Sequence, residues 1–131
     1  MSPDDLDTAL TLRTALARYE DLRTRDLFEE DDDHEPLSRA EALEMIALGE
    51  VIARKARYGR QLAVRTARER GASWSQIGRA LGTSKQTAWE THNRWIEQQA
   101  EQRRDRGHWG LDEAEAVRER DLAGRRPEDG E

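Results

Sequence analysis

Apolar residues recur at three- and four-residue steps near the start of the chain, which is the spacing of one face of an α-helix. The stripe consists of Ala9, Leu12, Leu16, Tyr19 and Leu22. Residues 2–5, Ser-Pro-Asp-Asp, are typical of a helix start: a capping serine, a proline in the first turn and acids that suit the positive end of the helix dipole. The pattern predicts one amphipathic helix over residues 3–28.

A second helical pattern runs from about Arg39 to Arg70, and Ser38 with Glu41 has the spacing of a capping box at its start. Its first half carries the apolar residues Ala42, Leu43, Met45, Ile46, Leu48, Val51 and Ile52. Its second half carries the basic residues Arg54, Lys55, Arg57, Arg60, Arg65, Arg68 and Arg70. We expect the first half to serve packing or dimerisation. Each of these basic residues could contact a DNA phosphate or simply belong to a solvated helix face, and the sequence does not decide between these two roles. Gly59 is a candidate position for a bend or split.

Residues 71–95, GASWSQIGRALGTSKQTAWETHNRW, predict two short helices joined by a tight turn. Ser73 and Gln76 have capping-box spacing at the start of the first helix, and Gly82 suits a left-handed turn at its end. Trp74, Ile77, Ala80 and Leu81 are predicted to line its inner side. Gly78 lowers helix propensity in mid-helix, which indicates close packing against the second helix.

The second short helix is predicted to begin at Lys85, with Thr83 or Ser84 as its cap, and to continue to about Arg104. Ala88 keeps its inner side small, Trp95 is predicted to be buried, and Trp89 can face either way. Hydrogen-bonding side chains recur on its outward side: Ser84, Lys85, Gln86, Thr87, Glu90, Thr91 and Arg94. Glutamine can pair with adenine, and lysine or arginine with guanine, so this side has the chemistry of DNA recognition.

The rest of the chain predicts less. Residues 29–37 contain the like-charge run EEDDDHE and are expected to form an acidic linker, with mimicry of DNA phosphate as a sharper alternative. Residues 112–122 predict a short acidic helix, against which Trp109 is a candidate for docking the tail. Residues 123–131, with glycine, proline and acids, are expected to be disordered.

The net charge of −6 conceals a strong asymmetry along the chain. Residues 1–52 carry a net charge of −10, residues 53–106 one of +8, and residues 107–131 one of −4. The segment around the two short helices is therefore basic between acidic flanks. Because DNA responds to the local field, this distribution favours a nucleic-acid partner for the central segment.

Composition indicates an all-α fold, because no strand-like alternation is present and 38% of the 131 residues are charged. There is no cysteine, and the three histidines have no metal-ligand spacing, so we expect no metal or other cofactor. Glycine-rich phosphate loops and positioned catalytic sets are also missing, so an enzyme is not expected. No apolar run approaches the length of a membrane span, and we expect a cytoplasmic protein without membrane association.

The segment WSQIGRALGTSKQTAW resembles the helix–turn–helix of bacterial transcription regulators and of the promoter-reading domain of sigma factors. Residues 37–95 are similar to small helix–turn–helix proteins of actinobacteria. The resemblance implies that Ser84, Lys85, Gln86, Trp89 and Glu90 face bases or phosphates. Two departures concern helix packing: Gly78 stands where alanine is usual, and Thr91 where an apolar residue is common.

These observations lead to one main interpretation, a sequence-specific DNA-binding transcriptional regulator that acts as a homodimer on double-stranded DNA. A recognition helix at about 84–104 would enter the major groove. The candidate DNA-binding residues are Arg79, Ser84, Lys85, Gln86, Thr87, Trp89, Glu90 and Arg94. The expected organisation is an amphipathic helix (1–28), an acidic linker (29–37), a helix–turn–helix domain (38–106) and an acidic, partly disordered tail (107–131).

Two alternatives remain at the level of sequence. The chain could be a protein-interaction adaptor, antitoxin-like or sigma-factor-binding, that acts through its acidic arms. RNA binding fits less well, because no sheet with an aromatic platform is predicted. The apolar stripes of the first helix and of residues 42–52 could pack on each other within one chain or across a dimer.

Overall fold

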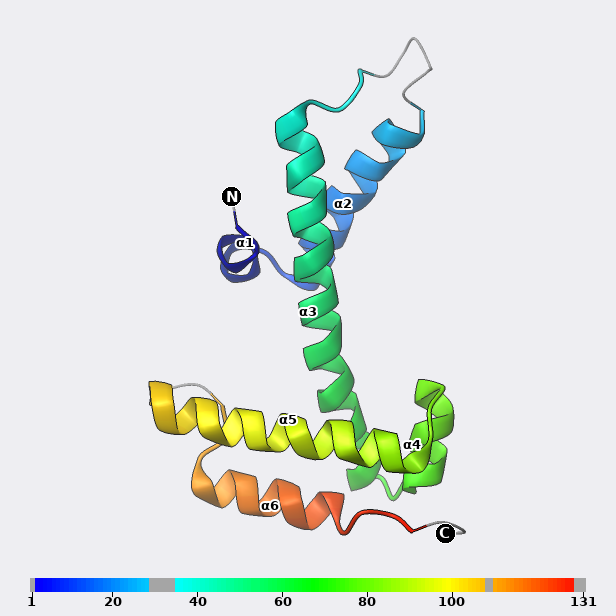
Figure 1. The fold of residues 1–131 in the computed structure, drawn as a ribbon, viewed down its shortest axis with the longest axis vertical. Helices are drawn as coiled ribbons and strands as arrows, with labels where there is room; N and C mark the ends of the chain where they lie inside the picture. Colours follow the sequence, from blue (N-terminus) through cyan, green and yellow to red (C-terminus); the bar gives the residue numbers. More distant parts are fainter. Residues whose placement is uncertain (1, 29–34, 108–109, 129–131) are drawn as a thin grey trace. The chain divides into compact units, whose positions relative to one another are not determined.

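The computed structural model describes residues 2–28, 35–107 and 110–128 (Figure 1), and all its regular elements in these ranges are α-helices. The predicted all-α class is therefore confirmed. The six helices in the described ranges are α1 (Pro3–Ala9), α2 (Leu12–Leu27), α3 (Arg39–Glu69), α4 (Trp74–Leu81), α5 (Lys85–Arg106) and α6 (Glu113–Ala123). No helix among the described residues is long and apolar enough to cross a membrane.

The chain divides into two compact units within α3: unit 1 comprises Met1–Gly59 and unit 2 comprises Arg60–Glu131. This division differs from the predicted domain boundaries at residues 29–37 and 106–107. The helix itself continues through Gly59, so the predicted split at this glycine does not occur. Most of the acidic run, residues 29–34, lies outside the described residues, as do His108 and Trp109.

The predicted single N-terminal helix is wrong, because the chain forms two helices that are separated at Leu10 and Thr11. Leu10 has extended backbone angles, φ −117° and ψ 146°, and closes α1. Thr11 caps α2: its side chain accepts a hydrogen bond from the Thr14 amide, and the Thr14 hydroxyl accepts one from the Thr11 amide. This reciprocal capping offers the backbone an alternative to a continuous helix, which periodicity does not reveal.

Aliphatic side chains form the core of unit 1. Leu22, Leu48 and Val51 are fully buried, with Ala15, Ala47 and Leu6 around them. The predicted stripes therefore pack on each other only in part within the chain: Leu22 lies in the core with Leu48 and Val51, whereas Leu12, Leu16, Leu43 and Ile46 are exposed. Two ion pairs join α2 to α3: Arg18 donates to both carboxylate oxygens of Glu44, at 2.8 and 3.1 Å, and Arg25 pairs with Glu41.

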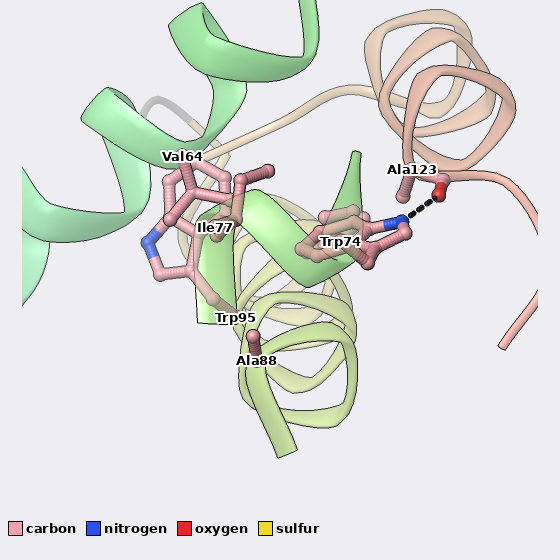
Figure 2. Packing of buried hydrophobic residues seen from close by; sticks show 7 residues of the cluster. Val64, Trp74, Ile77, Ala88, Trp95 and Ala123 are labelled. Atoms are coloured by element: carbon pink, nitrogen blue, oxygen red, sulfur yellow. Dashed lines mark hydrogen bonds between the residues drawn. The ribbon is translucent and has the colours of Figure 1, made fainter. Parts of the chain in front are cut away.

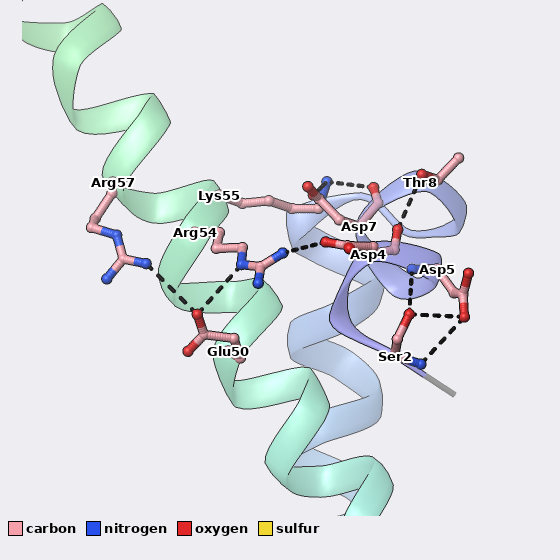
Figure 3. Close-up of polar contacts among 9 residues, drawn as sticks. All are labelled: Ser2, Asp4, Asp5, Asp7, Thr8, Glu50, Arg54, Lys55 and Arg57. Atoms are coloured by element: carbon pink, nitrogen blue, oxygen red, sulfur yellow. Dashed lines mark hydrogen bonds and ion pairs between the residues drawn. The ribbon is translucent and has the colours of Figure 1, made fainter. Parts of the chain in front are cut away.

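The acidic helix α1 lies against α3 in unit 1 and pairs with its basic residues (Figure 3). Arg54 Nη1 lies 2.8 Å from an Asp4 oxygen, and Lys55 Nζ lies 2.8 Å from an Asp7 oxygen. Arg57 is 3.9 Å from Glu50 on its own helix. These three basic residues therefore have carboxylate partners within unit 1.

Unit 2 contains the end of α3, then α4, α5 and α6. Figure 1 shows α6 antiparallel to α5, and Arg120 on α6 donates to both carboxylate oxygens of Glu97 on α5, at 2.7 and 3.1 Å. Gly107 ends α5 with a φ of 76°, and Asp112 caps α6. Helix α6 thus forms close to its predicted position, and α5 extends two residues beyond its predicted end.

Candidate nucleic-acid interface

The segment from α4 through the turn at Gly82–Ser84 to α5, here called the α4–α5 unit, has the local structure expected from its caps. Ser73 and Gln76 form the predicted capping box, with hydrogen bonds of 2.9 and 3.1 Å. Gly82 has a φ of 74° and starts the turn. Ser84, rather than Thr83, caps α5, because its side chain accepts a hydrogen bond from the Thr87 amide.

Gly78 brings α4 into direct contact with the turn. A Cβ placed on Gly78 would lie 2.9 Å from the Thr83 carbonyl oxygen and 3.0 Å from the Lys85 amide nitrogen. Contacts this short with backbone atoms are closer than real Cβ contacts, so this position requires glycine. The close packing predicted from Gly78 is therefore present, and it sets the approach of α4 to the start of α5.

A cluster of large side chains holds the α4–α5 unit against α3 and α6 (Figure 2). Its buried members are Val64, Trp74, Ile77, Ala88, Trp95, Ile96 and Ala123. Trp95 and Ala88 are buried as predicted, whereas Ala80 of the predicted inner side is exposed. Since α5 buries Ala88, Trp95 and Ile96, its remaining sides are those available to a partner or to α6.

His92 is a buried polar residue that sequence reasoning did not single out. Only 1% of it is exposed; Trp95 stacks on its ring at 5.4 Å between centroids, and Trp74 lies at 5.8 Å. Its Nδ1 forms a 2.9 Å hydrogen bond with Gln61. Burial first, and then the charges of Arg65 and Arg68, lower the pKa of His92 to about 4. The imidazole is therefore neutral near pH 7 and has a structural role.

Six of the eight predicted site residues occupy three different environments. Ser84 and Thr87 are exposed but form the cap of α5, where their hydroxyls are 3.0 Å apart. Lys85 and Gln86 are half-buried in the first turn of α5. Arg79 on α4 and Arg94 on α5 are exposed.

Trp89 and Glu90, the other two predicted site residues, are engaged by the C-terminal segment. The Trp89 indole nitrogen donates to the Gly124 carbonyl at 3.0 Å. Arg126 donates through Nε and Nη2 to one carboxylate oxygen of Glu90, at 3.0 and 2.7 Å. The prediction of disorder from residue 123 onward is therefore wrong for Ala123–Glu128; residues 129–131 lie outside the described residues.

Residues 123–128 are ordered for a physical reason that their own composition does not reveal. Trp74 donates to the Ala123 carbonyl at 2.8 Å (Figure 2), and Pro127 is buried. A buried indole N–H needs an acceptor, and here two tryptophans use backbone carbonyls of the tail. The usable signal in the sequence was the presence of two tryptophans in the motif, Trp74 and Trp89, whose indole N–H groups need acceptors, and not the tail's own residues.

Two arginines of α3 that the sequence offered as phosphate contacts are tied within unit 2. Arg68 donates to the carbonyls of Leu122 and Ala72, at 3.1 and 3.0 Å, and lies over the Trp74 ring. Arg65 lies 3.6 Å from Glu119 of α6. The exposed basic residues in the described part of unit 2 that appear in no ion pair there are Arg60, Arg70, Arg79, Arg94, Arg104, Arg118 and Arg125.

Beside the start of α4 is a small open hollow lined by Arg68, Ser73, Trp74, Ser75, Lys85 and Pro127. It combines two cations with hydroxyl groups, but it is shallow and open. No cluster of three or more potential metal ligands occurs among the described residues. The chemistry of this surface is thus hydrogen bonding and positive charge.

Comparisons with models of known protein families, with curated proteins and with solved structures find no significant match to this chain. Any functional proposal therefore depends on the residues and the geometry described above.

Proposed function

We propose that the chain is a DNA-binding protein that uses the α4–α5 unit as a helix–turn–helix, with α5 as the recognition helix, and that it regulates transcription. The observation that carries the proposal is the contact of Gly78 with the turn, 2.9 Å for a Cβ on Gly78. Such a close approach fixes α4 against the start of α5, so the two helices meet at a defined position. Two helices joined in this way, with the second entering the major groove, are the arrangement of a helix–turn–helix.

Charge and chemistry support the same proposal. Residues 53–106 carry a net charge of +8, and Arg79 and Arg94 are exposed on the two helices of the unit. Lys85 and Gln86 stand in the first turn of α5, where side chains and the positive helix end both suit contacts with phosphates and base edges. Glu90 is less suited to an unassisted base contact, since Arg126 holds its carboxylate.

The test is a fluorescence-anisotropy titration of a generic DNA duplex over a range of salt concentrations. We expect binding that weakens steeply with salt, because each phosphate contact releases counterions. Lys85→Glu should lower affinity roughly tenfold or more, since it puts a negative charge where the phosphates approach. Circular dichroism would establish that the variant remains helical.

The matched control is Arg13→Glu, an identical change of net charge on an exposed residue of unit 1. It should reduce affinity much less than Lys85→Glu. Equal losses in the two variants would mean that only net charge matters, and no binding at low salt, either by the folded wild type or by a folded chain that ends at Gly124, would refute the proposal.

A homodimer through unit 1 is part of the proposal. Leu43 and Ile46 are 60% and 70% exposed and lie three residues apart on one side of α3, while Leu12 and Leu16 are exposed on α2. Large exposed apolar side chains grouped on one surface are typical of interaction sites. Dimerisation would pair two recognition helices and extend the DNA site.

Ile46→Lys tests the dimer by sedimentation equilibrium. The wild type should sediment as a dimer and the variant as a monomer, because a buried lysine at an apolar interface is strongly unfavourable. The control Arg39→Ala, at an exposed polar position of the same helix, should remain dimeric. A monomeric wild type at all concentrations would refute the dimer. It would favour a partner other than a second copy of the chain for this surface.

A further inference from the structure

The C-terminal residues Gly124–Glu128, here called the tail segment, cross the side of α5 that carries two predicted base-reading residues. Gly124 accepts a hydrogen bond from the Trp89 indole, and Arg126 binds the Glu90 carboxylate with two hydrogen bonds. Trp89 is half-buried as a result. The tail segment thus occupies the space beside α5 that a DNA groove wall would need.

The tail segment also reaches the start of α4. Pro127 is buried and lines the same hollow as Ser73, Ser75 and Lys85. In a helix–turn–helix, the start of the first motif helix and the start of the recognition helix are both close to the DNA backbone. One short segment therefore contacts the reading side and the phosphate side of the proposed interface.

We propose that the tail segment is an internal cover of the DNA-reading surface, and that DNA and the tail segment compete for α5. The inference rests on the proposed function. Three of the last four residues of the chain are acidic, so the residues that follow Pro127 carry negative charge, which DNA phosphates repel. DNA binding then requires the tail segment to leave Trp89 and Glu90, and Lys85 is exposed further when Pro127 leaves.

The anchors of the tail segment are weak enough to be reversible. Arg126 and Glu90 are 57% and 43% exposed, and exposed ion pairs contribute little to stability. The Trp74–Ala123 hydrogen bond is different, because it is buried and fixes the end of α6. Release would therefore begin at Gly124 and would leave α6 and the core in place.

Competition of this kind lowers the apparent DNA affinity by the fraction of molecules in which the surface is uncovered. The structure offers a matched pair of variants to measure this fraction. Arg126→Ala and Arg125→Ala each remove one positive charge from adjacent exposed residues, but only Arg126 has an ion-pair partner among the described residues. Both variants lose the same electrostatic attraction to DNA. A difference between their DNA affinities therefore measures the effect of the contact between Arg126 and Glu90.

A third variant ends the chain at Gly124, which keeps α6 and the Gly124 carbonyl on Trp89 but removes Arg126 and Pro127, so it uncovers Glu90 and the start of α4. It removes two arginines and three acids, so the net charge changes by only one. Anisotropy titrations of a generic duplex at one salt concentration would compare the wild type with the three variants. Circular dichroism would confirm that each has the helix content of the wild type.

We expect Arg126→Ala to bind DNA about two- to fivefold more tightly than Arg125→Ala, and the shortened chain about tenfold more tightly than the wild type. Equal affinities of the two arginine variants, together with unchanged or weaker binding by the shortened chain, would overturn the cover. Weaker binding would assign the tail segment to the DNA interface.

The outcomes separate this inference from the proposed function. If the wild type binds DNA and Lys85→Glu does not, while removal of the tail brings no gain, only the cover is refuted. If neither the wild type nor the shortened chain binds at low salt, both proposals are refuted together.

Discussion

The two compact units have different kinds of core. In unit 1, Leu22, Leu48 and Val51 are fully buried, and all buried side chains among its described residues are aliphatic. In unit 2, the buried set includes Trp74, Trp95 and the polar pair His92 and Gln61. Burial stabilises aliphatic side chains in many different arrangements. Buried polar groups are stable only in arrangements that provide their hydrogen-bond partners.

The surfaces of the two units differ in the same sense as their cores, because unit 1 is the more apolar in both. Among the large hydrophobic side chains that are exposed in the described residues, all but Val117 belong to unit 1. Unit 2 instead exposes arginines, and the indole N–H groups of Trp74 and Trp89 donate to backbone carbonyls. The comparison indicates that unit 1 is suited to association through an apolar surface, and unit 2 to holding polar side chains in fixed positions.

The largest expected effect tests how strictly each core is specified. Trp74→Ala should destabilise unit 2 by about 3–5 kcal/mol, because it removes a large buried side chain and the partner of the Ala123 carbonyl. Leu48→Ala should destabilise unit 1 by about 2–5 kcal/mol. Urea unfolding followed by circular dichroism measures both.

Conservative replacements sharpen this contrast. Trp74→Phe keeps an aromatic ring but leaves the Ala123 carbonyl without its donor, which costs about 1–3 kcal/mol, whereas Leu48→Met should cost less than about 1.5 kcal/mol. Equal costs for the two replacements would show that hydrogen bonding adds nothing to the specificity of unit 2.

The second prediction uses pH. The pKa of His92 in the folded protein is about 4, below its ordinary value of 6.5, so the unfolded chain binds the proton more tightly. The stability that depends on neutral His92 is complete above pH 6.5 and is lost as the pH falls toward 4. We expect unit 2 to lose about 2 kcal/mol between pH 7 and pH 5 in urea titrations.

Unit 1 should behave differently over the same range. A hydrogen bond from Arg25 lowers the pKa of Glu41 from 4.5 to about 2, so its contribution is lost only below about pH 4.5. His92→Gln is the control in unit 2. This variant removes the titration of His92 but keeps that of Glu119. Burial raises the pKa of Glu119, so its titration stabilises unit 2 as the pH falls, which is opposite to the effect of His92. An unchanged pH slope in His92→Gln would contradict the assignment.

The smallest effects come from two helical glycines. A Cβ on Gly78 would meet backbone at 2.9–3.0 Å, whereas a Cβ on Gly59 would meet nothing within 4 Å. Gly78→Ala should therefore destabilise unit 2 by about 1–3 kcal/mol despite its better helix propensity. Gly59→Ala should stabilise α3 by about 0.5–1 kcal/mol. Thermal unfolding of both variants measures the difference, and a stabilising Gly78→Ala would contradict the close approach of α4 to the turn.

Local signals in the sequence predicted most of the helices. The caps at Ser38, Ser73 and Gly82 lie where their spacing indicated, because a cap is a contact between residues three or four positions apart. The cap at Thr11 has the same local chemistry, but it is absent from the predicted caps, so the prediction was one N-terminal helix. Periodicity continued across Leu10 and gave no sign of the break.

The candidate site was only partly predictable. Side chains that face solvent or form caps, such as Arg94 and Ser84, were placed by helical phase. Helical phase also placed Glu90 on the outward side of the helix and left both sides open for Trp89. It did not predict their partners, because these are more than thirty residues away in the chain. No local rule connects a glycine–arginine–arginine–proline segment to an indole.

By itself, the sequence determined the helical class and most helix ends, since these depend on backbone preferences and short-range hydrogen bonds. It also indicated close packing at Gly78, but the contact with the backbone of the turn is what requires glycine there. Only the tertiary structure decided which apolar side chains of α2 and α3 are buried together, that His92 is buried with Gln61, and that the tail segment lies on α5. These contacts join residues far apart in sequence, and each depends on which donors and apolar surfaces remain unsatisfied after the helices have formed.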